Sequence, residues 1–171
     1  MKLPTVNSDG QALAKVSATE DLVASSQAYS WNSQNIDIAA AGTLLAVRND
    51  SPDQDLVVTH GIISGGNAST RYEVHKVTAA YTSGTQANGA AINGVPMGPG
   101  GGKAAATSHS DETGNVQVAA NVFMEVTTLA VTTIEVQIGL VLGGGEAIAV
   151  DQVTESTAGA VILFGYFVDR E

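Results

Sequence analysis

Residues 43–63, TLLAVRNDSPDQDLVVTHGII, decide the expected fold. Two apolar stretches flank a short polar segment, NDSPDQD, whose residue types initiate turns through side-chain hydrogen bonds to the backbone and a fixed proline φ angle. Both flanking stretches are apolar on both faces of an alternating pattern, so the sequence predicts a hairpin in the middle of a sandwich. On its second strand, Leu56, Val58, His60 and Ile62 are expected to share one face.

The same two-residue period recurs along the chain. Further strands are expected at residues 28–31, 36–40, 69–77, 116–126, 134–142, 146–150 and 160–168. The last of these, AVILFGYFV, is apolar on both faces and is expected to be buried on both. About eight strands without a convincing long helix predict an all-β fold, a β-sandwich with a jelly roll as the favoured topology. Its core is expected to centre on Leu56, Val58, Ile134, Val136, Ile138, Leu163 and Phe167.

Two segments lack this period. Residues 1–25 are expected to form an irregular N-terminal arm, with a helical turn at residues 18–24 as the alternative. Residues 79–110 are rich in Gly and Ala and are expected to form a long excursion with an exposed tip at Gly98–Gly102, although a short strand could lie at residues 91–92. Residues 26–171, including this excursion, are predicted to form a single sandwich domain.

Composition excludes several classes of function. The net charge is −10, and only 14% of the 171 residues are charged, so nucleic acid is not expected as a partner. The absence of cysteine excludes thiolate metal sites, disulfides and cysteine nucleophiles. The sequence MKLPTVNSDGQALAK lacks the apolar run of a secretory signal, and no stretch reaches the ~18 apolar residues of a membrane helix. We therefore expect a protein that is soluble when made and has no membrane partner.

The three histidines, His60, His75 and His109, are the first candidates for a metal site. His75 is expected to face outward beside Glu73, while His60 lies on an apolar face, so the two would point to opposite sides. A third ligand is not apparent, and satisfied or exposed histidines are favoured over a metal site.

Three carboxylates, Asp50, Asp53 and Asp55, gather in the polar turn. Carboxylates at such spacing can bind calcium, but the segment does not match the pattern of an EF-hand loop. Because Asp is ordinary at hairpin turns, a structural role is favoured.

Two motifs resemble catalytic or binding signatures only superficially. The run Gly98–Lys103 fails as a phosphate-binding loop, because Met97 and Ala104 stand where a glycine and a Ser or Thr are required. The cluster of residues 108–111, Ser-His-Ser-Asp, contains the residue types of a catalytic triad, but adjacency in sequence does not build one. We predict solvated polar residues here, no catalytic, cofactor or metal site, and no enzyme activity.

The order of features resembles the head decoration (cement) proteins of tailed bacteriophages and related accessory β-sandwich proteins of the virion. The resemblance covers residues 40–171, from the strand that leads into VRNDSPDQDLVVTHGII, through the Gly/Ala/Thr-rich middle, to the closing strand GAVILFGYFVDRE, and the loose N-terminal arm adds to it. It implies a homotrimer on the capsid surface of a virion, made in the host cytoplasm, that bridges subunits of the major capsid protein. It implies no catalytic residues.

The low charge and the small-residue segments independently suit a protein packed against copies of itself and a shell. The alternative is a receptor- or glycan-binding module of a fibre or appendage, which would use the 79–110 segment with Trp31 or Tyr81 as a stacking platform. An enzyme ranks third, because no acid, base and nucleophile converge.

Overall fold

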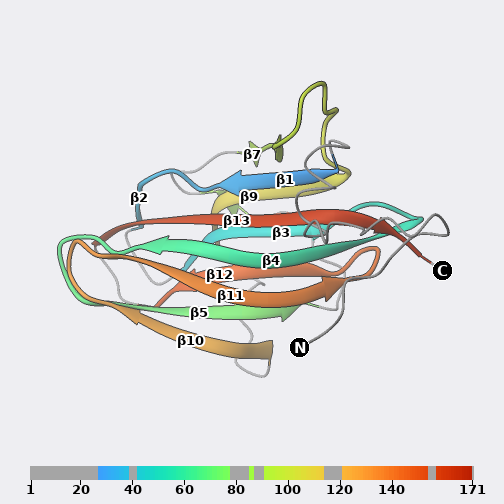
Figure 1. The fold of residues 1–171 in the computed structure, drawn as a ribbon. Helices are drawn as coiled ribbons and strands as arrows, with labels where there is room; N and C mark the ends of the chain where they lie inside the picture. The colour runs from blue at the N-terminus through green and yellow to red at the C-terminus, as the bar shows by residue number, and fades with distance from the viewer. Residues whose placement is uncertain are drawn as a thin grey trace, which may run out of the picture.

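The computed structural model describes residues 27–38, 42–77, 85–86, 91–113, 121–153 and 157–170. These residues form two antiparallel β-sheets that pack face to face as a sandwich (Figure 1). The described ranges contain no α-helix, so the predicted all-β sandwich is confirmed. The expected arm, residues 1–25, lies outside the described residues.

Sheet I has six strands and sheet II has seven. Sheet I contains β1 (Ala28–Asn32), β2 (Ile36–Ile38), β4 (Gln54–Ser64), β8 (Val95–Pro96), β11 (Thr133–Leu142) and β13 (Thr157–Asp169). Sheet II contains β3 (Gly42–Asn49), β5 (Thr70–Val77), β6 (Thr85–Gln86), β7 (Ala91–Ile92), β9 (Ala106–Thr113), β10 (Val122–Thr128) and β12 (Ala147–Gln152). The strand order is β11-β4-β13-β1-β8 in sheet I and β10-β5-β12-β3-β9-β6 in sheet II, with β2 paired to β13 and β7 paired to β9.

Strand pairing follows a nested pattern. β1 pairs with β13, β3 with β12, β4 with β11 and β5 with β10, all antiparallel. Each early strand therefore pairs with a late strand in reverse order, as if one long hairpin had been wrapped around the core. Eight strands in two sheets connected in this way form a jelly roll, the topology that the sequence favoured.

Residues 43–63 form a corner between the sheets and not the expected hairpin. β3 belongs to sheet II, whereas β4 belongs to sheet I. The turn chemistry is as predicted: Asn49 Oδ1 accepts a hydrogen bond from the backbone N–H of Ser51 (2.9 Å), and Ser51 Oγ accepts one from the N–H of Gln54 (3.1 Å). The hairpin prediction was wrong because turn chemistry is local, whereas the strands that pair with β3 and β4 are distant in the sequence.

A β-bulge moves His60 to the outer face of sheet I. Relative to β13, β4 contains one extra residue, Thr59. An extra residue reverses the alternation of every side chain that follows it. The buried positions beyond the bulge are therefore Gly61 and Ile63, and the prediction that His60 and Ile62 share the inner face was wrong.

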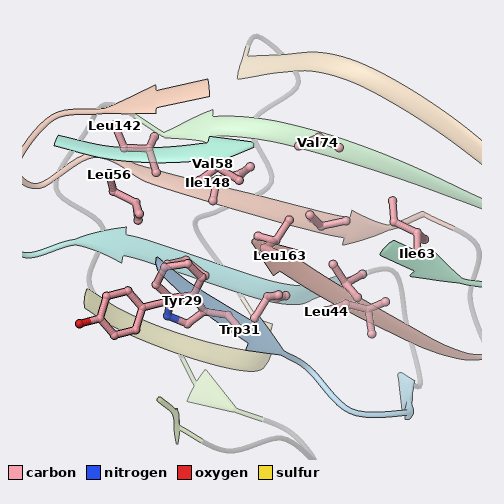
Figure 2. Close-up of a cluster of buried hydrophobic side chains, with 14 of the residues drawn as sticks. Tyr29, Trp31, Leu44, Leu56, Val58, Ile63, Val74, Leu142, Ile148 and Leu163 are labelled. Carbon is pink, nitrogen blue, oxygen red and sulfur yellow. The ribbon is translucent and has the colours of Figure 1, made fainter. Parts of the chain in front are cut away.

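The core between the sheets is built mainly from aliphatic side chains of both sheets (Figure 2). Four of the seven predicted core residues have exposures of 3% or less: Leu56, Val58, Leu163 and Phe167. The other three come from β11 and pack against the core while remaining partly buried. Their partial exposure follows from the position of β11 at the edge of sheet I.

The Gly/Ala-rich excursion is shorter than predicted. Its last part belongs to β9, which pairs with β3 from Asn49 to Thr43, and the short strand suspected at residues 91–92 is β7. The polar sequence of β9, ATSHSDET, hides its strand character because it lacks apolar alternation. Between β8 and β9, a loop that contains the exposed residues Pro99 and Gly100 projects from the sandwich (Figure 1).

Candidate functional site

The three histidines lie apart. His60 lies on the outer face of sheet I, where its ring stacks on Phe164 with ring centroids 4.5 Å apart. His75 lies on the outer face of sheet II, opposite the inward Tyr72 and Val74, as expected, but it is buried there, with 1% exposure. His109 is on β9, separated from the strand of His75 by β12 and β3. Within the described residues, no three side chains of His, Cys, Asp or Glu form a group that could hold a metal ion.

Two of the three carboxylates of the polar turn lie beside arginines. Arg48 Nε lies 2.6 Å from Asp50 Oδ1, and Arg170 Nε lies 2.5 Å from Asp55 Oδ1. The backbone carbonyl oxygen of Asp53 accepts a hydrogen bond from the backbone N–H of Arg170 at 3.0 Å. These contacts give Asp50 and Asp55 cationic neighbours within the chain, as expected for a structural turn.

The triad-like cluster on β9 is divided between two faces of sheet II. Ser108 and Ser110 are buried, and Ser108 Oγ donates to the carbonyl oxygen of Ile92 at 2.8 Å. His109 lies between the two serines along the strand, so its side chain points to the opposite face. The hydroxyl groups and the imidazole therefore do not meet. The side chain of Asp111 lies outside the described residues.

Residues 98–103 do not form a phosphate-binding loop, and Trp31 does not form a stacking platform. Residues 98–103 lead into strand β9, not into the helix that a phosphate-binding loop requires. Trp31 is 0% exposed and packs beside Tyr29, with ring centroids 6.0 Å apart, so it cannot offer a stacking platform to a glycan. Tyr81 lies outside the described residues.

A buried polar cluster, which we call the Asp151 cluster, crosses three neighbouring strands of sheet II. It comprises Thr43 on β3, Asp151 on β12, and Glu73 and His75 on β5. Thr43 Oγ1 donates to Asp151 Oδ1 at 2.5 Å, and His75 Nε2 lies 2.8 Å from Asp151 Oδ2. His75 Nε2 also lies 3.5 Å from Glu73 Oε2, and Arg71 Nη2 lies 3.3 Å from Glu73 Oε1. Cross-strand register creates the cluster, because Asp151 stands opposite both Thr43 and Glu73.

The Asp151 cluster contains the residue types of a nucleophilic triad but connects them in the wrong order. A nucleophilic hydroxyl must bond to the base that removes its proton. Here the hydroxyl of Thr43 bonds to the carboxylate of Asp151 and not to the imidazole of His75. Thr43, His75 and Asp151 are all exposed by 1% or less, so a substrate cannot reach them. The arrangement supports a stabilising role.

The residues that complete this cluster could have been recognised in part from the sequence. Asp151 directly follows the apolar run AIAV of β12, and a carboxylate at the end of a buried strand needs a partner. Thr43 could not be found, because a bulge near residue 44 changes its pairing: Val150 stands opposite Leu45, but Asp151 stands opposite Thr43.

A second buried polar group lies on the inner face of sheet II, around Tyr72. The Tyr72 hydroxyl donates to the carbonyl oxygen of Ser64 at 3.1 Å. Burial raises the pKa of Tyr72 above its ordinary value, and hydrogen bonds with the side chains of Thr70 and Thr128 offset this only in part. The phenol therefore stays neutral and acts as a structural donor.

The outer face of sheet I offers the clearest candidate for a binding surface. Six apolar side chains there, which we call the outer apolar face, are half-buried: Val57, Ile62, Ile162, Phe164, Tyr166 and Val168. Two exposed valines lie at its margins, Val141 on β11 (49% exposed) and Val95 on β8 (61% exposed). The expectation that residues 160–168 are buried on both faces was thus wrong for the chain alone, because the outer face of β13 is only partly covered.

Comparisons with known proteins assign this chain to no family: no family model, no characterised protein and no solved structure matches it. Among the described residues, no helix is long and apolar enough to cross a membrane. A function must therefore be argued from the jelly roll, the Asp151 cluster and the outer apolar face.

Proposed function

We propose that this protein is a structural component of a virion that decorates and stabilises a phage capsid by bridging subunits of the major capsid protein. The observation that carries the proposal is the outer apolar face, a sheet surface on which no other described strand packs. Large exposed apolar patches mark interaction sites in soluble proteins. In this proposal the chain acts as a homo-oligomer, and a trimer is favoured at the three-fold positions of an icosahedral shell.

The chemistry of the described residues is in keeping with a structural role. In the Asp151 cluster, Thr43, His75 and Asp151 are closed to solvent, and the hydroxyl of Thr43 bonds to a carboxylate and not to a base. The net charge of −10 disfavours the packaged genome as a partner, because phosphates would be repelled. The jelly roll itself occurs both in viral capsid proteins and in lectin domains, so the fold alone does not decide between shell binding and glycan binding.

The buried position of Trp31 favours shell binding over the glycan-binding alternative. A glycan platform needs an exposed aromatic ring, and Trp31 is 0% exposed. By contrast, the outer apolar face and the projecting loop of residues 97–105 suit contacts with large protein surfaces (Figure 1). Many copies on one shell would hold well even if each contact were weak, because avidity multiplies modest affinities.

Co-sedimentation tests the proposal. Purified protein is mixed with heads of the tailed phage whose genome encodes it, prepared without this protein, and the mixture is centrifuged through sucrose. We expect saturable binding, with heads that already carry the protein as the control that takes up little more. Protein that remains in the supernatant at every concentration would refute the proposal, and binding to a glycan array instead would favour the alternative.

A truncated chain tests the predicted arm. If residues 1–25 bridge neighbouring subunits, deleting them should weaken head binding while the far-UV circular dichroism stays that of a β protein. Flexible segments that order on contact can wrap a neighbour's surface. Head binding as tight as that of the full chain would remove the arm from the proposal.

A further inference from the structure

The two outer faces of the sandwich differ sharply in burial. On sheet II, the outward side chains Ala46, Ala147, Ala149, His75 and Asp151 are exposed by 1% or less. On sheet I, the outer apolar face is half-buried, and its marginal residues Val95 and Val141 are exposed. One outer face is therefore closed within the chain, and the other still has apolar surface to bury.

Register places the apolar side chains of sheet I in continuous rows. One row contains Val141, Val57 and Tyr166, which stand opposite one another on β11, β4 and β13. In the next row, Phe164 pairs with His60, on which its ring stacks. Side chains in such rows are direct cross-strand neighbours and form one surface.

The central rows hold no carboxylate or lysine. The next row, in which Ile162 pairs with Ile62, ends in the exposed Glu135 on β11. At the other end of the face, Val168 pairs with Asp55, whose carboxylate is held by Arg170. The charges thus lie at the margins of the face.

The face is large enough for a stable contact. Strands β11, β4, β13 and β1 span about 19 Å at the usual spacing between strands, and residues 160–168 span about 30 Å, which gives about 600 Å² on each copy. Specific protein interfaces bury about 800 Å² on each partner, and about 500 Å² is the lower limit. Two such faces packed together, about 10 Å apart, would extend the sandwich by one more layer.

We infer that the outer apolar face is the surface through which two copies of this chain associate. A second copy fits because the face is self-complementary: a two-fold axis in its plane, through the His60–Phe164 row, sets apolar rows against apolar rows. The net charge of −10 opposes association elsewhere, since copies repel one another wherever their charges come close. The uncharged centre of this face keeps that repulsion low.

The inference rests on the self-association in the proposed function but gives it as a dimer in solution, and it does not require a capsid. Like faces that meet about a two-fold axis form a dimer in solution, whereas the trimer proposed above concerns positions on a shell. The proposed binding to heads and the inferred association in solution can therefore be disproved separately.

Light scattering after size-exclusion chromatography tests the inference on the full chain. At about 50 μM we expect twice the chain mass of 17.3 kDa. Tyr166→Lys should weaken the dimer at least tenfold and yield monomer, because an interface tyrosine is a common hot spot. Lysine also reduces the net negative charge, so lost association could not come from added repulsion. Ile62→Lys provides a second variant on a neighbouring strand, and circular dichroism checks that both fold.

Leu129→Lys is the matched control, since Leu129 is apolar and 70% exposed but lies in the turn after β10. It should leave the dimer intact. A monomeric or trimeric wild type, or a dimer that survives both face variants, would overturn the inference, as would a control that dissociates the dimer equally. If the wild type is a monomer and Tyr166→Lys abolishes co-sedimentation with heads, the face binds the shell, and only the inference fails.

Discussion

Replacing Asp151 by alanine should lower the free energy of unfolding by about 3–5 kcal/mol, because it leaves two buried polar groups unsatisfied at about 1–3 kcal/mol each. Both carboxylate oxygens have close neighbours: Thr43 Oγ1 donates to Oδ1 at 2.5 Å, and His75 Nε2 lies 2.8 Å from Oδ2. Asp151 is 1% exposed, so water cannot replace it as an acceptor. The substitution therefore leaves a buried hydroxyl and a buried imidazole without their partner.

Urea unfolding followed by circular dichroism measures this loss. With a denaturant slope of about 2 kcal/mol/M, the midpoint should fall by about 1.5–2.5 M. All variants must be compared at one protein concentration, because association stabilises the folded state by mass action. Thr43→Val should cost about 1.5–3 kcal/mol, since it removes only the hydrogen bond to the charged group.

Glu125→Ala is the matched control. Glu125 is an exposed carboxylate on β10 that stands opposite Glu73, and its loss should change stability by less than about 0.5 kcal/mol. A loss below about 1 kcal/mol for Asp151→Ala, or one equal to that of the control, would refute the reasoning. Asp151→Asn then separates charge from shape, because asparagine keeps an acceptor for Thr43 but removes the negative charge beside His75.

Two further predictions concern the buried Gly159 and the ion-paired Glu146. Gly159→Ala should destabilise the fold by about 1–3 kcal/mol in urea unfolding, because its Cβ would lie 2.4 Å from Gln152 Oε1; unchanged stability would show that the Gln152 side chain moves freely. Burial raises the pKa of Glu146, but the backbone N–H of Gly143 and the nearby Lys76 outweigh it, so the pKa is lowered below 4.5. A carboxyl group whose pKa is lower in the folded than in the unfolded protein stabilises the fold at pH values above the unfolded pKa. This stabilisation is lost as the pH falls through the folded pKa. Glu146→Gln should thus cost about 0.5–1 kcal/mol at pH 7 and progressively less as the pH falls through the lowered pKa; a cost that does not change with pH would contradict this.

Much of the fold could be predicted from local signals. The alternation of β5 separates the buried Tyr72 and Val74 from Arg71 and Glu73, because a period of two residues fixes the inner face of a regular strand. The turn that begins at Asn49 was also recognisable, because its hydrogen bonds reach only a few residues along the chain, although its role as a corner between the sheets was not. These features need no information about distant partners.

The remaining features depend on pairing between distant strands. His60 moved to the outer face because β4 has one residue more than β13 at Thr59, and nothing in the sequence of β4 alone indicates this. On the neighbouring strand β11, Gly139 has a φ of +63°, a conformation that glycine adopts readily, beside the register shift with β4. Glycines inside otherwise regular strands, Gly139 on β11 and Gly165 on β13 at its register shift with β4, were therefore the available signals of irregular pairing.

The position of the Gly/Ala-rich excursion follows from the same long-range pairing. The nested pairs make the first half of the chain one arm of a long hairpin and the second half the other, and the bend lies between Val77 and Val122. Extra residues at any other connection would lie between two strands, both of which must stay in register with partners far along the chain. At the bend they change only the length of a closing loop, which costs little free energy because closure entropy grows with the logarithm of length. A jelly roll can therefore carry a long, small-residue segment at this bend without losing its core, and part of that segment, β9, extends sheet II beside β3. Contacts made by the projecting loop can vary independently of the sandwich, whereas contacts made by the outer apolar face cannot, because the strands that present it also build the core.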